Sequence, residues 1–66
     1  MMTAEPKTNV SIYVDEGDSF VVIMKRTIRA LRLAGKDTES QEFQREVTSG
    51  QKPFMDVVSE WVTIAS

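Results

Sequence analysis

The sequence predicts a mainly α fold: a small three-helix domain with an N-terminal extended arm or single β-strand, which a dimer would allow to pair. Two observations predict it. Three segments repeat apolar side chains at helical spacing, and one segment near the N-terminus alternates apolar and polar side chains. The length of 66 residues suffices for one domain only. We assign residues 1–7 to a flexible leader and residues 8–66 to that domain.

Residues 8–14 are the alternating segment. Val10, Ile12 and Val14 fall on one side, a pattern typical of a half-buried strand. Only one segment of this kind exists in the chain, and a lone strand leaves its backbone N–H and C=O groups unpaired. We therefore expect it either to pack on the helices as an ordered arm or to pair with the same strand of a second chain.

The first helix is predicted over residues 18–34. Asp18 or Ser19 supplies a side-chain oxygen that can cap its first free amides, and Gly35 supplies the left-handed residue that ends it. Its apolar side chains fall in one broad arc that predicts the core-facing side. These are Phe20, Ile23, Met24, Ile28, Ala30, Leu31 and Ala34.

Two shorter helices follow. Thr38 and Gln41 match a capping box, which predicts a helix over residues 39–47. Pro53 suits the first turn of a third helix over residues 53–64. Several β-branched residues weaken the end of that helix, so we expect the last residues either to fray or to end as a strand.

Composition narrows the function classes. The chain has no cysteine and no histidine, and it shows no pair of carboxylates placed for acid–base chemistry. We therefore expect no enzyme activity, no metal site and no cofactor. The apolar content of 41% is thin for a monomer without disulfides, so we expect a homodimer or higher oligomer.

Charge and hydropathy narrow the surroundings. The longest apolar run is five residues, and the N-terminus lacks the apolar core of a signal peptide. We expect a cytoplasmic protein without a membrane partner. The net charge is −2, which makes nucleic acid the less favoured partner.

The charges are nevertheless unevenly distributed. Residues 19–36 hold five basic and no acidic residues, and four of the basic ones align along the first helix. This basic stripe consists of Lys25, Arg29, Arg32 and Lys36. Val22 and Leu33 lie outside both the apolar arc and the stripe, which indicates a second contact surface.

The basic stripe has two interpretations. It can bind an acidic protein or a phosphate backbone. Alternatively, it can act as the internal counter-charge of the fold, opposite acidic residues of the later helices. Those acids are Glu39, Glu42, Glu46 and Glu60.

The aromatic residues divide into two groups. Phe43, Phe54 and Trp61 lie on apolar faces with valines, which favours core packing over stacking on nucleic-acid bases. Tyr13 should point outward beside Asn9 and Ser11 if the opposite side of the strand is buried. These three polar side chains of the arm are candidate contact residues.

The order of strand, acidic turn, helix, glycine and capped helix resembles the ribbon-helix-helix DNA-binding regulators and antitoxins. Residues 9–15 look like the strand of that family, and residues 38–47 are similar to its second helix. The resemblance implies strands paired across a dimer, backbone amides near Thr38 on phosphate, and outward strand side chains on bases. Those side chains would be Asn9, Ser11 and Tyr13. The strand carries no arginine or lysine, since the basic stripe lies on the first helix.

The predicted function is a non-enzymatic protein-interaction or regulatory module. The alternative is a DNA-binding regulator or antitoxin of the ribbon-helix-helix kind.

Overall fold

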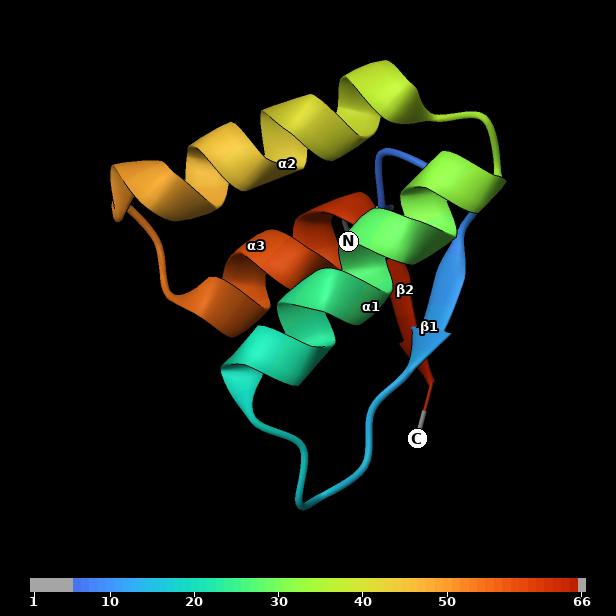
Figure 1. Ribbon diagram of the computed structural model, residues 1–66. Coiled ribbons are helices and arrows are strands. Elements are labelled where there is room, and N and C mark those ends of the chain that lie inside the picture. Colours follow the sequence, from blue (N-terminus) through green and yellow to red (C-terminus); the bar gives the residue numbers. More distant parts are fainter. Residues whose placement is uncertain (1–5, 66) are drawn as a thin grey trace, which may run out of the picture.

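A computed structural model describes residues 6–65 of the chain. Along the chain, three helices lie between two short strands (Figure 1). Most of the regular structure is helical, which confirms the mainly α fold class. The elements are β1 (Ser11–Tyr13), α1 (Phe20–Leu33), α2 (Asp37–Ser49), α3 (Phe54–Trp61) and β2 (Thr63–Ala65).

Helix α1 begins and ends where its capping residues place it. The Ser19 hydroxyl accepts a hydrogen bond from the Val22 amide at 3.3 Å, which satisfies one of the free donors of the first turn. At the other end, Gly35 has a φ of 75°, and its amide donates to the Arg32 carbonyl. The Lys36 amide donates to the Leu31 carbonyl, completing a Schellman motif. Both predicted ends of this helix are therefore confirmed to within two residues.

Helix α2 begins earlier than the capping box predicts. The turn after Gly35 is so short that the Lys36 carbonyl already accepts the Ser40 amide at 2.9 Å. Thr38 consequently lies inside the first turn, and no side chain caps this helix. Asp37 and Glu39 place negative charge at the positive end of the helix instead. The helix predicted over residues 39–47 is confirmed with wider bounds, Asp37–Ser49, but the prediction that Thr38 caps it is wrong.

Helix α3 ends earlier than the apolar pattern predicts. Val62 is extended, with φ −140° and ψ 161°, and residues 63–65 form β2. The β-branched residues at this end therefore form a strand rather than a last helical turn. The predicted helix over residues 53–64 is corrected to Phe54–Trp61, preceded by Pro53 as the N-cap.

The strand β1 finds its partner in the same chain. It pairs in parallel with β2, and Ile12 lies opposite Ile64. Backbone bonds from the Thr63 amide to the Val10 carbonyl and from the Val14 amide to the Ala65 carbonyl extend the ladder. The expectation that the last residues end as a strand is confirmed, and this strand pairs with β1. The backbone pairing of β1 therefore uses β2 of the same chain and not the same strand of a second copy.

The other edge of β1 is partly covered by Arg26. Backbone polar groups of successive strand residues point to opposite edges, so the Tyr13 carbonyl points away from β2. The Arg26 guanidinium donates to that carbonyl and to Asp18 Oδ2, the latter at 2.8 Å. Asp18 also accepts the Asp15 amide at 2.9 Å, which fixes the turn before α1.

The elements pack in three layers (Figure 1). Helix α2 lies against α1 and α3, while β1 contacts α1 and β2 contacts α3. Nine apolar side chains within residues 6–65 form one buried cluster at the centre. They are Val10, Ile12, Ile23, Leu31, Phe43, Val57, Val58, Trp61 and Val62. Phe20, predicted for the core, is instead 60% exposed and meets Phe54 edge-on at 5.6 Å between ring centroids.

Candidate functional site

Helix α1 separates a buried side from a charged outer side. Ile23, Thr27 and Leu31 are spaced four residues apart and are all buried against the other elements. This phase turns the basic stripe outward. Lys25, Arg29 and Arg32 are exposed, and Lys36 is half-buried at the start of α2.

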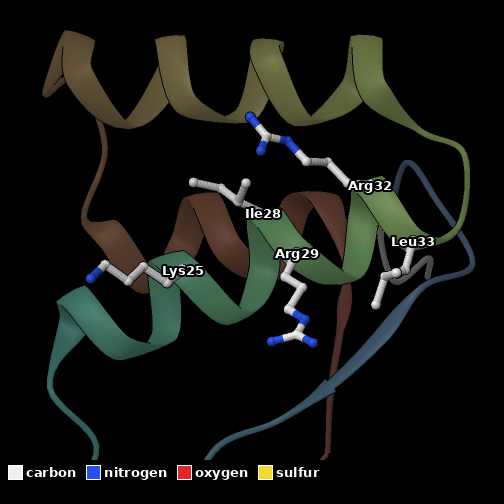
Figure 2. A pocket seen from close by; sticks show the side chains of 5 residues that line it. All are labelled: Lys25, Ile28, Arg29, Arg32 and Leu33. Atoms are coloured by element: carbon white, nitrogen blue, oxygen red, sulfur yellow. The ribbon is translucent and has the colours of Figure 1, made fainter.

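A shallow open groove lies on this outer side (Figure 2). We call it the α1 groove; its volume is about 450 Å³. It is lined by Lys25, Ile28, Arg29, Arg32 and Leu33. In this view Ile28 and Arg32 extend toward α2, whereas Arg29 and Leu33 extend toward the strands. Basic and apolar side chains of one helix thus line the same groove.

The cations of the basic stripe have no carboxylate partner within residues 6–65. The ion pairs there use Lys7, Arg26 and Lys52 as their cations. Two of the acids that the counter-charge interpretation requires, Glu46 and Glu60, are bound by Lys7 and Lys52. The direct ion pairs expected of an internal counter-charge are therefore not formed by the stripe in the described part of the chain.

The polar side chains of β1 are exposed but separate from the α1 groove. The alternation predicted for this segment is confirmed, since Val10 and Ile12 are buried. Asn9, Ser11 and Tyr13 point outward, and Tyr13 is 54% exposed. Because α1 residues alone line the groove, the structure does not bring these three into it.

The aromatic side chains support core packing. Phe43 and Trp61 are buried, and Phe54 is half-buried. The rings of Phe43 and Trp61 are consequently covered by the fold and not available as stacking platforms for bases. The Trp61 Nε1–H donates to Glu46 Oε1 at 2.8 Å, which satisfies the polar atom of this buried ring.

A second group of charges surrounds Trp61, and we call it the Trp61 cluster. Lys52 Nζ lies 2.9 Å from Glu60 Oε1 and 3.3 Å from Glu46 Oε2. Lys7 Nζ lies 3.0 Å from Glu60 Oε2 and 4.4 Å from the centroid of the Trp61 ring, a cation–π contact. The cluster therefore ties the N-terminal segment to α2, to the α2–α3 turn and to α3.

The same cluster corrects the prediction of a flexible leader for Lys7. Its amide donates to the Glu60 carbonyl at 2.9 Å, and the neighbouring Thr8 hydroxyl donates to the Trp61 carbonyl at 2.6 Å. Pro6 is half-buried, and residues 1–5 of that predicted leader lie outside the described residues.

Ion pairing favours the charged forms of Glu60 and Lys52 in this cluster. Hydrogen bonds from Lys52 and then Lys7 lower the pKa of Glu60 from its ordinary 4.5 to about 2. Hydrogen bonds to Glu60 and Glu46 raise the pKa of Lys52. Elsewhere, the Asp15 amide and the Arg26 guanidinium lower the pKa of Asp18. Each pKa shift favours the charged form of its group, as expected of structural ion pairs.

Sequence patterns missed Ile28 as a groove residue. Its apolar character assigned it to the core arc, yet it lies at the edge of that arc, beside Lys25 and Arg32 on the helix surface. Its position at the boundary between the apolar arc and the basic stripe is the sequence feature that could have identified it as a groove residue. Leu33 was separated from both surfaces by the pattern, and the structure leaves it 79% exposed.

Comparison with protein-family models, with curated proteins and with solved structures gives no match. Among residues 6–65, no three acidic side chains gather as a metal site would require. The described helices are all too short and too polar to cross a bilayer.

Proposed function

We propose that this chain is a non-enzymatic protein-interaction module and that it contacts its partner through the α1 groove. One observation carries the proposal: three exposed cations line the same groove as the apolar side chains of Ile28 and Leu33, and none of these cations has an ion-pair partner within residues 6–65. Exposed charge beside exposed apolar surface is typical of a contact surface.

The nearest rival to the α1 groove as a functional centre is the Trp61 cluster. Two carboxylates and two lysines meet there, but each group is held by another. A general acid or base needs a pKa near the working pH, and the pKa of Glu60 is lowered to about 2. The cluster is better explained as a structural tie, which supports a non-enzymatic role.

Self-association, a cytoplasmic location and the ribbon-helix-helix alternative remain predictions. The last requires two β1 strands to pair across a dimer. In this chain β2 occupies one edge of β1, and Arg26 binds the Tyr13 carbonyl at the other.

The proposal can be tested by cross-linking the tagged full chain in its own cells and comparing two charge reversals. Arg29→Glu changes the groove, while Arg45→Glu makes the same change on an exposed part of α2. We expect the partners cross-linked by the wild type to persist with Arg45→Glu and to be lost with Arg29→Glu.

Circular dichroism of both variants provides the folding control. If folded Arg29→Glu captures the same proteins in the same yield as the wild type, the groove is not the contact surface and the proposal fails.

A further inference from the structure

We infer that the α1 groove binds an acidic amphipathic helix of a partner protein. Aliphatic side chains of that helix contact Ile28 and Leu33, and its carboxylates meet the cations of the groove. This inference rests on the proposed interaction function and adds the chemistry of the partner.

The apolar part of the groove indicates that the partner brings more than negative charge. Leu33 is 79% exposed, the largest exposed fraction among the large apolar side chains of residues 6–65. Ile28 adds apolar surface to the same groove. Aliphatic side chains placed here would remove both surfaces from water, whereas a chain of phosphates would leave them uncovered.

The spacing of the cations indicates a helical partner. Lys25 and Arg29 are four residues apart, and Arg32 follows three residues later. On a helix these intervals correspond to about 6 Å and about 10 Å from Lys25 along the axis. Carboxylates at positions i, i+4 and i+7 of a second helix repeat the same intervals, so two such helices can pair side by side.

The shape and charge of the rest of the molecule argue against an extended polyanion. The groove is built by one helix, and its three cations lie within about two turns of it (Figure 2). The whole chain carries a net charge of −2. DNA or an anionic bilayer presents many more negative charges than three cations can neutralise, and the net negative charge of the chain opposes its approach.

The test uses the full chain and a labelled synthetic peptide of about 18 residues, long enough to form helix on binding. The peptide carries glutamates at i, i+4 and i+7 with leucines between them on the same face. One matched peptide has the leucines replaced by serine at equal charge, and another has the same composition in scrambled order. Fluorescence anisotropy at physiological salt measures each affinity.

We expect the amphipathic peptide to bind about tenfold more tightly than the serine or scrambled peptide. Leu33→Ser should remove most of that preference. Because Leu33 is exposed and lies outside the buried core, this substitution leaves the core intact. Arg29→Glu should weaken binding about tenfold, while Arg45→Glu should change it less than about twofold.

Three results would overturn the inference: no binding of the amphipathic peptide, equal binding of the serine peptide, or tighter binding of duplex DNA or anionic vesicles. None of them decides the proposed function. That function fails only if Arg29→Glu leaves the cellular cross-links unchanged, so the two failures are distinguishable.

Discussion

The Trp61 cluster and the α1 groove use charge in opposite ways. In the cluster, Glu46 and Glu60 are each held by lysine within 3.3 Å, and Glu46 also accepts the Nε1–H of the buried Trp61. In the groove, three cations lie beside Ile28 and Leu33 and form no ion pair within the described chain. The difference separates charge that stabilises this fold from charge that is left for another molecule.

The largest expected effect comes from removing the centre of the cluster. Trp61→Ala should lower the free energy of unfolding by about 3–5 kcal/mol, because it leaves a cavity and deprives Glu46 of its hydrogen-bond donor. Urea denaturation monitored by circular dichroism measures this loss. A change below about 1 kcal/mol would mean that Trp61 is not part of the core.

Removing one charge from the cluster should have a smaller effect. Glu60→Gln should cost about 1–2 kcal/mol, since two lysines lose their shared carboxylate. Glu42→Gln makes the same change on an exposed part of α2, at a carboxylate outside the observed ion pairs, and is the comparison variant. Equal stability of Glu60→Gln and the wild type at neutral pH would show that the ion pairs contribute nothing.

The same residue predicts a pH dependence. Folding lowers the pKa of Glu60 from 4.5 to about 2, so its stabilisation is complete above about pH 4.5 and is lost as pH falls toward 2. The wild type should therefore lose more stability than Glu60→Gln over this interval. If the unfolding free energies of the two proteins fall in parallel between pH 4.5 and 2, the lowered pKa of Glu60 is contradicted.

A still smaller effect is expected at the edge of β1. Arg26→Gln removes the ion pair with Asp18 and weakens the cover of the Tyr13 carbonyl. We expect a loss of about 1 kcal/mol and more self-association at high concentration, because an uncovered strand edge favours pairing. Analytical ultracentrifugation measures the second effect. A variant that sediments as the wild type does at every concentration would remove this role.

Local patterns in the sequence predicted what local forces decide. The Ser19 cap, the end of α1 at Gly35 and the alternation of β1 depend on neighbouring residues, and the structure confirms all three. The helical period also separated the basic stripe from the buried side of α1, and the structure agrees. It did not reveal the groove, because the contribution of Ile28 depends on where the other elements stop covering α1.

Contacts between distant residues were beyond these patterns. The register of β1 with β2 joins Ile12 to Ile64, and no local spacing encodes that pairing. Lys7 and Glu60 meet for the same reason, so the segment predicted to be flexible is bound. The start of α2 was missed because the tight turn after Gly35 overrode the preference of Thr38 for a cap.

The contrast between the two regions is tested most directly by comparing the unfolding free energies of two neutralised variants in urea. One replaces Lys25, Arg29 and Arg32 of the groove with glutamine, and the other replaces Lys7 and Lys52 of the cluster. We predict that the groove variant stays within about 0.5 kcal/mol of the wild type, while the cluster variant loses about 1–2 kcal/mol. A groove variant that loses more stability than the cluster variant would contradict the account, since the basic stripe would then belong to the fold.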